Sequence, residues 1–531
     1  MVIRRGQLGT SRYLVAVHAV VWIAFWWCAS SVSAQPDGFS AVQEKAVLLR
    51  PLEAGWSMRI KTLVASPDSA HVVYRAVRTT VPDAESVVLD DQRDPGRHYI
   101  VGPTFSPDST KVAYLSNRKG YWLLHVDGRS VPAYAPIQPP VFSPDGKTVA
   151  YLARRGRLRS WVVGGVAHEP FDSIAGNTIT FSADSSRHAY VARRGRQWFM
   201  VDNGRPVGPF DRIVTGPVFS GDSSKLAFVA VVASRQAVVV NERVGPSYFR
   251  IGGRPVFSPD SSQLAYWAFK GDRNWVVVRD GREDSNYLAN EPGDIVFSPN
   301  SAHLATQLKR DRKWQVVVGG RTGFAYDAIG DGSATFSGDS TRLAYGAMRS
   351  GRWFVVTNGR EQPEYEALLA AGLRFSPDSS HLVYGAKRDG KWHIVTDGVE
   401  GPTFDEVAAS TLTFSPDGSR LAYVGFRDRR PYVVVDGRAY GSSDAVGPPV
   451  FSGDSGTTAW LARRDGRYLV VVDGVPGRKR FDRLVPGARL VADPDGGFHT
   501  VAYRMPSQQL FRLTVTPQPA PAMAGVEVGS Q

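Results

Sequence analysis

Side chains that could serve as paired acids or as metal ligands recur along the chain at a nearly constant spacing. Most stand fourth in the motif F-S-P-D-S, as in residues 105–109 and 257–261, with Ala or Gly replacing Pro in some copies. Twelve copies argue against catalysis, because a catalytic or metal site needs a few unlike groups that converge once. We therefore interpret these residues as structural turn anchors and expect neither a metal site nor a cofactor. The anchors are Asp68, Asp108, Asp145, Asp184, Asp222, Asp260, Asn300, Asp339, Asp378, Asp417, Asp454 and Asp495.

A second motif with catalytic potential is G-D-S-G at residues 453–456, the nucleophile sequence of chymotrypsin-like proteases. Its aspartate, Asp454, is the eleventh anchor, and the same register reads S-P-D-S in other copies, so we interpret it as a turn. The histidines are scattered and none forms H-E-x-x-H. We name no catalytic residue and favour a protein without enzymatic activity.

The anchors mark the first turn of a repeated unit of four strands. In the copy that starts at residue 255, the segments 255–258, 264–267 and 275–278 are short and rich in apolar residues, as strands are. The polar sequences P-D-S, K-G-D-R and D-G-R separate or follow them as turns. We expect the fourth strand at segments such as 171–174, 210–213 and 326–329. Successive anchors are 37 to 41 residues apart, and a repeated four-stranded unit of that length indicates an all-β propeller.

The F-S-P-D-S/G anchor, the L-A-Y second strand and the D-G-R turn together resemble a known repeat. It is the WD-repeat-like propeller repeat of bacterial exported proteins, as in TolB-type propellers and the propellers of prolyl-oligopeptidase enzymes. The resemblance extends over roughly residues 60–515. It implies a type of blade and no particular function.

The number of units bears on domain organisation, because twelve blades exceed the four to eight of ordinary propellers. The sequence favours two six-bladed propellers in tandem, over residues 61–288 and 289–515; seven plus five blades and one large ring are the alternatives. The last unit shows only three strands. We expect a spare strand at residues 46–49, within the N-terminal segment 35–60, to complete that blade and remove its open edge. Residues 516–531 are expected to form a flexible tail.

The first 34 residues have the composition of a secretory signal peptide. Arg4, Arg5 and Arg12 precede an apolar stretch over residues 13–28, and the small residues 32–34 fit a cleavage site. We therefore expect a periplasmic or extracellular protein without a membrane span; tethering by an uncleaved signal anchor is the alternative. The single cysteine of the chain, Cys28, lies in this leader, which excludes a disulfide scaffold.

The remaining pattern is charge, since the 531-residue chain carries a formal net charge of +13. In copies two to eleven, the hairpins between second and third strands hold 27 basic and five acidic residues. These hairpins share one face of an up-and-down propeller, so we predict a basic face that attracts anionic partners. Arginine dominates, and guanidinium groups suit carboxylate, sulfate or phosphate. The candidate binding residues are Arg154, Arg155, Arg157, Arg193, Arg194, Arg196, Lys309, Arg310, Arg312, Lys387, Arg388, Arg427, Arg429, Arg463 and Arg464.

Two alternatives accompany these surface assignments. Some hairpin bases could pair with acids such as Asp172, Asp327 and Asp405, which would leave only a solvated polar rim. Tryptophans also recur at the start of third strands, as at Trp198 and Trp275. We interpret them as packing between blades, with aromatic platforms for sugars as the alternative.

The sequence thus favours an exported, non-enzymatic propeller scaffold that binds a protein, an anionic polysaccharide or another anionic envelope polymer. A pore-centred carbohydrate-active enzyme, such as a polysaccharide lyase, is one alternative. A structural subunit of an envelope assembly is another. Expected export argues against nucleic acid as the partner, and the sequence assigns no oligomeric state.

Overall fold

The structure is a computed structural model that describes residues 42–49, 54–90, 92–94, 99–271, 274–330, 332–369, 372–441, 443–505, 507 and 509–517. The expected signal peptide, residues 1–34, and residues 518–531 of the expected tail lie outside these ranges. The only helices among the described residues are two 3-10 turns, η1 (Ile60–Thr62) and η2 (Ala175–Asn177). Neither approaches the length and apolarity that crossing a bilayer requires.

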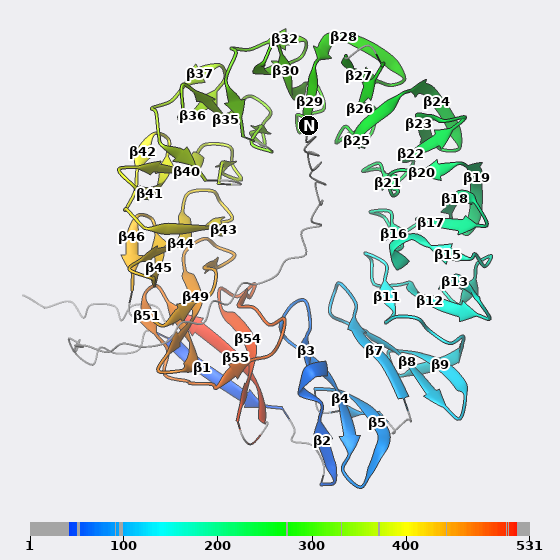
Figure 1. Cartoon of the computed structure of the whole chain (residues 1–531). Helices are drawn as coiled ribbons and strands as arrows, with labels where there is room; N and C mark the ends of the chain where they lie inside the picture. The colour runs from blue at the N-terminus through cyan, green and yellow to red at the C-terminus, as the bar shows by residue number, and fades with distance from the viewer. Residues whose placement is uncertain are drawn as a thin grey trace, which may run out of the picture. The chain divides into compact units, whose positions relative to one another are not determined.

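Twelve antiparallel sheets of four strands make up the described chain, which confirms the twelve-bladed propeller fold (Figure 1). In blades 1 to 11 the chain runs through a first, second, third and fourth strand in turn. Because neighbouring strands are antiparallel, the hairpin from second to third strand lies on the same side as the crossover from a fourth strand to the next blade. We call this the hairpin side, and the opposite side, with the anchor turns, the anchor side.

The first strand of each blade pairs with the second, and a bulge or a break divides it. The first-strand segments, from blade 1 to blade 12, are β2 (Trp56–Met58) with β3 (Val64–Ala65), β7 (Tyr99–Phe105), β11 (Val141–Phe142), β15 (Ser173–Ile174) with β16 (Thr180–Phe181), β20 (Arg212–Ile213) with β21 (Val218–Phe219), β25 (Arg250–Phe257), β29 (Glu291–Phe297), β33 (Ala328–Ile329) with β34 (Thr335–Phe336), β38 (Ala367–Leu368) with β39 (Arg374–Phe375), β43 (Glu406–Phe414), β47 (Ala445–Val446) with β48 (Val450–Phe451), and β52 (Arg483–Leu484) with β53 (Val491–Ala492).

The second strands contain the L-A-Y sequence or a variant of it and are buried on both faces, because each sheet packs between two neighbours. This explains their almost continuous apolar character. They are β4 (Val72–Arg78), β8 (Val112–Arg118), β12 (Val149–Arg155), β17 (His188–Arg194), β22 (Leu226–Val232), β26 (Leu264–Phe269), β30 (Leu304–Arg310), β35 (Leu343–Arg349), β40 (Leu382–Arg388), β44 (Leu421–Arg427), β49 (Thr458–Arg464) and β54 (Phe498–Arg504).

The third strands are rich in valine, and the short fourth strands follow a tight turn. The third strands are β5 (Val81–Leu89), β9 (Tyr121–Val126), β13 (Leu158–Val163), β18 (Gln197–Asp202), β23 (Arg235–Val240), β27 (Trp275–Arg279), β31 (Lys313–Val318), β36 (Arg352–Thr357), β41 (Lys391–Thr396), β45 (Arg430–Val435), β50 (Arg467–Val472) and β55 (Gln509–Pro517). The fourth strands are β6 (Gln92–Arg93), β10 (Arg129–Ala133), β14 (Val166–Ala167), β19 (Arg205–Phe210), β24 (Arg243–Tyr248), β28 (Arg282–Ala289), β32 (Arg321–Thr322), β37 (Arg360–Glu361), β42 (Val399–Glu400), β46 (Arg438–Tyr440), β51 (Val475–Pro476) and β1 (Val42–Leu48).

The segments expected as fourth strands, such as 171–174, are crossovers between blades, so that expectation was wrong. Phe171 still bridges to Arg159 on the third strand of blade 3. Ser173 already pairs with Arg193 on the second strand of blade 4. The chain therefore changes blades at Asp172, and the sequence pattern had merged the end of one strand with the start of the next.

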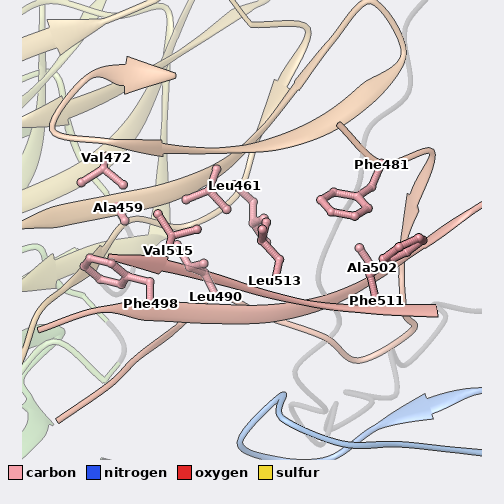
Figure 2. Packing of buried hydrophobic residues seen from close by; sticks show 11 residues of the cluster. Ala459, Leu461, Val472, Phe481, Leu490, Phe498, Ala502, Phe511, Leu513 and Val515 are labelled. Atoms are coloured by element: carbon pink, nitrogen blue, oxygen red, sulfur yellow. The ribbon is translucent and has the colours of Figure 1, made fainter. Parts of the chain in front are cut away.

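Hydrophobic clusters join every blade to the next one. Twelve such clusters occur among the described residues, and each combines side chains from two consecutive blades. Figure 2 shows the one between blades 11 and 12, where Leu461 and Val472 face Phe498 and Leu513. Burying such apolar surface stabilises the fold by roughly 25 cal/mol per Å².

The last blade closes with a strand from the N-terminal segment. β1 pairs antiparallel with β55, from Val42 opposite Pro517 to Leu48 opposite Phe511. This is the pairing that the missing fourth strand requires. β55 ends at Pro517, so the first two residues of the expected tail belong to the blade.

The division into two six-bladed propellers is not shown by the structure. Blades 6 and 7 share a cluster that includes Trp267 and Leu304, like any other pair of neighbours. Blade 12 also packs against blade 1, where Val501 and Tyr74 belong to one cluster. The contacts of the described residues form one closed series of twelve blades, as in the single-ring alternative.

Candidate functional site

The anchor residues form one hydrogen-bonded turn that recurs in all twelve blades. In blade 6, Ser258 Oγ donates to Asp260 Oδ1 at 2.6 Å, and the same oxygen accepts the N–H of Ser262 at 3.0 Å. At every anchor from Asp68 to Asp495, the side-chain oxygen accepts a hydrogen bond from the backbone N–H of the residue two positions later. Asn300 takes the same part with its amide oxygen. The anchors are thus turn-forming residues.

Most anchor turns also fasten their blade to the next. The N–H of Asp260 donates to Ser301 Oγ of blade 7 at 3.0 Å, and the N–H of Asp222 donates to Ser261 in the same way. These serines have a φ near +60°, so the position takes Ser or Gly in every repeat. The G-D-S-G sequence is one such turn, because Ser455 accepts the N–H of Asp417 at 3.1 Å.

The same hydrogen bonds set the ionisation of the anchor carboxylates. Donation by Ser220 and by the N–H of Ser224 lowers the pKa of Asp222 to about 2. Donation by Ser376 and Ser380 likewise lowers the pKa of Asp378 to about 2. A carboxylate that stays ionised and fully hydrogen-bonded cannot serve as a general acid near neutral pH.

On the hairpin side, an arginine at the end of the second strand clamps the crossover that precedes its blade. The Arg388 guanidinium lies 4.7 Å from the ring centroid of Tyr365 and donates to Glu364 O. Arg427 lies 4.5 Å from the Phe404 ring and donates to Thr403 O at 2.7 Å. Such a cation–π contact contributes about 0.5–1 kcal/mol at exposed sites.

Several candidate binding residues therefore have a structural role. Arg155 stacks on Tyr134, Arg194 stacks on Phe171, and Arg310 donates to the carbonyls of Asn286 and Leu288. Arg464 donates to Ser443 at 3.4 Å, and burial together with Arg480 lowers its pKa. These arginines fix crossovers in place.

Acidic side chains neutralise the hairpins of blades 7 to 9. Lys309 pairs with Glu291 at 3.1 Å, Lys313 with Asp327, and Lys391 with Asp405. Arg388 pairs with Glu400. Asp327 and Asp405 lie in crossovers and also accept backbone N–H groups from the next hairpin. The pairing anticipated as an alternative is present here, so these four bases carry little free positive charge.

Four candidate residues on the hairpins of two consecutive blades are exposed without an acidic partner, and we call them the basic patch: Arg154, Arg157, Arg193 and Arg196. Among the described residues, no carboxylate lies within 4.0 Å of their guanidinium groups. Arg193 contacts the hydroxyl of Ser173 at 3.4 Å. All four belong to the hairpins of blades 3 and 4, which contain no acidic residue.

The other candidates are dispersed over later blades. Arg312 and Arg429 are exposed at the hairpin tips of blades 7 and 10. Lys387 lies 6.0 Å from the Trp392 ring, and the Nε of Arg463 is buried. They do not add to the basic patch.

Three exposed tyrosines on the hairpin side of blade 2 were not predicted from the sequence. The exposed fractions of Tyr99, Tyr121 and Tyr134 are 54%, 79% and 44%. By contrast, the tryptophans singled out at third-strand starts, such as Trp198 and Trp275, are half-buried against the clusters between blades. Tyr121 could have been recognised from the sequence, because it occupies a hairpin position that basic residues fill in many other blades.

The remaining clusters of side chains that could bind a ligand or react are small. No three His, Cys, Asp or Glu side chains in the described ranges gather as metal ligands would. His168 and His188 stack at 5.0 Å between blades 3 and 4, and burial lowers the pKa of His188 to about 4. A cavity of about 370 Å³ is lined by Glu400 and Tyr423.

Comparisons with known proteins find only partial matches, to solved structures of low sequence identity. No family model matches it, and no curated protein is detectably similar. A eukaryotic initiation factor structure shares 13% identity with a TM-score of 0.34, over 61% of this chain and 94% of that one. TolB from Acinetobacter baumannii shares 14% identity (TM-score 0.23; 49% and 77% covered). The Dos1 propeller shares 9% (TM-score 0.27; 55% and 90% covered).

Proposed function

We propose that this protein is an exported, non-enzymatic β-propeller scaffold that binds an anionic macromolecule through the basic patch. The observation that carries the proposal is the contrast among hairpins of one repeat. Arg154, Arg157, Arg193 and Arg196 are exposed and lack acidic partners, whereas most of the lysines on the hairpins of blades 7 to 9 are paired with acids.

Physical arguments support anion binding by this patch. Its four guanidinium groups stand on two consecutive hairpins held at fixed spacing by the cluster between blades 3 and 4. Each guanidinium can make bidentate bonds to carboxylate, sulfate or phosphate. With a Debye length of about 8 Å at physiological salt, only close groups reinforce one another, so clustering matters more than net charge.

The test is the binding of the full chain to immobilised sulfated polysaccharide, polygalacturonate and polyphosphate at about 150 mM salt. The variant R154E/R157E/R193E/R196E should weaken binding by about tenfold or more, and affinity for the native chain should fall steeply with salt. The matched control R129E/R243E/R282E/R360E makes the same charge change at exposed turns of the anchor side. It should retain most of the binding. Equal losses in both variants, or no binding to any of the polymers, would refute the proposal.

A further inference from the structure

The hairpin side of blade 2 exposes aromatic rings at positions where other blades have polar or smaller apolar residues. Tyr121, at the end of the hairpin opposite Arg118, is 79% exposed. The equivalent positions in blades 4, 7, 8 and 9 are Gln197, Lys313, Arg352 and Lys391. Tyr99, paired with Asn117, stands where blades 4 and 7 have Ser173 and Glu291. Exposed aromatic surface is costly in water, so its concentration on one blade points to a ligand.

These tyrosines adjoin the basic patch. Tyr134 lies in the crossover from blade 2 to blade 3, where its N–H donates to Tyr151 at 3.0 Å. Its ring receives the Arg155 guanidinium at 5.2 Å. In the same crossover, Ala135 O accepts the N–H of Arg154 at 2.8 Å. Aromatic rings and unpaired arginines thus follow one another from blade 2 to blade 4.

The ring of Tyr99 is held in place. Tyr99 meets Trp122 edge to face, with centroids 5.9 Å apart and an interplanar angle of 86°. Trp122 itself packs against the cluster between blades 2 and 3. Tyrosine has two side-chain torsions and an apolar face with a polar tip, so it can cover a ligand ring at little entropic cost.

We propose that the hairpin side of blades 2 to 4 binds an acidic polysaccharide. The faces of its sugar rings stack on Tyr99 and Tyr121, and its carboxylate or sulfate groups bind the arginines of the basic patch. This inference rests on the proposed function and specifies its ligand class. Polyphosphate has the charge but no ring faces, so it can use only half of this surface.

Single-stranded nucleic acid combines charge with stacking bases and is the competing ligand. The secretory leader expected over residues 1–34 favours a ligand outside the cytoplasm, and therefore the polysaccharide. An oligodeoxythymidylate is accordingly included in the test as a probe that can overturn the proposal.

The experiment measures the binding of the full chain to four probes at about 150 mM salt. They are a heparin dodecasaccharide, an oligogalacturonate, a polyphosphate of similar charge and an oligodeoxythymidylate. The variant Y99A/Y121A is compared with Y99F/Y121F, which keeps the rings. It is also compared with F249A/F324A, which removes two aromatic residues of 56% and 59% exposure elsewhere. Thermal melting verifies that each variant is folded.

We expect Y99A/Y121A to weaken at least one acidic oligosaccharide by about tenfold and polyphosphate by less than about twofold. The phenylalanine variant and F249A/F324A should bind like the native chain. Equal loss for sugar and polyphosphate, no loss at all, or tighter tyrosine-dependent binding of the oligodeoxythymidylate would overturn the inference. If R154E/R157E/R193E/R196E alone abolishes binding and the tyrosine variant has no effect, only the ligand class is wrong. If the arginine variant also has no effect, the proposed function fails.

Discussion

The anchor side and the hairpin side of the blades are built from the same repeat but differ in how strictly they repeat. At the anchor turns, the hydrogen bond between the anchor oxygen and the backbone N–H two residues later recurs from Asp68 to Asp495. At the hairpins, the arginine that clamps the crossover recurs in many blades, but the surrounding charges do not. Several bases of blades 7 to 9 pair with acids of a crossover, a first strand or a fourth strand, whereas blades 3 and 4 leave four arginines unpaired.

This difference separates structural from functional residues within a repeat protein. A side chain found in every blade must satisfy a need that every blade has, such as capping a turn or joining a neighbour. Binding requires that one place differ from the rest. The exposed tyrosines of blade 2 and the basic patch of blades 3 and 4 are such departures, and they lie on consecutive blades.

The largest effect on stability is expected from the anchor side. Ser258 is buried, donates to Asp260 and accepts the N–H of Gln263 at 2.9 Å. Replacing Ser258 with Ala leaves these groups without partners and should lower the free energy of unfolding by about 1–3 kcal/mol. Chemical denaturation measures the change, with R157A as a hairpin-side control that should alter stability by less than about 0.5 kcal/mol. Loss of polyanion binding in folded Ser258→Ala would mean that the anchor side also binds ligand.

A second test measures how the stability from the anchor carboxylates depends on pH. The pKa values of Asp222 and Asp378 lie near 2 in the folded chain, below the ordinary value of 3.8. A lowered pKa means that the stabilisation is complete above about pH 4 and is lost as the pH falls through about 2. Thermal midpoints measured from pH 5 to pH 2 should therefore decline. The decline should be smaller in D222N/D378N, which cannot titrate at these positions; an identical decline in both proteins would contradict this assignment.

The smallest effect is expected from freeing two paired lysines on the hairpins of blades 7 and 9. In D327N/D405N the amides can still accept the N–H groups of Ser350 and Asp428, but Lys313 and Lys391 lose their counterions. Stability should change by less than about 1 kcal/mol, because exposed ion pairs contribute little. Binding of sulfated polysaccharide should strengthen about two- to threefold, as measured by titration. Unchanged affinity would show that unpaired charge outside blades 3 and 4 does not contribute.

Much of the fold could be predicted from local sequence, and the errors have local causes. The twelve units, their turns and the second and third strands follow from hydrophobic patterning and from the P-D-S and D-G-R turns. The boundary between fourth and first strands failed at Phe171 to Ile174, because the crossover there is a single residue, Asp172, with paired residues on both sides. The structure leaves fewer of the candidate binding residues exposed and unpaired than the sequence suggests, and their part in binding stays a prediction.

The sequence by itself determined the blade, because a turn needs only its own residues, and Ser258, Asp260 and Ser262 are neighbours in the chain. It also determined where basic residues concentrate. Only the tertiary structure decided which of them are free, because the partner acids lie outside the hairpins. Lys313 pairs with Asp327, and Arg194 pairs with Glu169. These partners are too far apart in the sequence for a local pattern to predict the pairing. The pairing of β1 with β55 and the packing of blade 12 on blade 1 likewise join opposite ends of the chain. Closure and free charge are long-range properties, whereas the repeat is a local one.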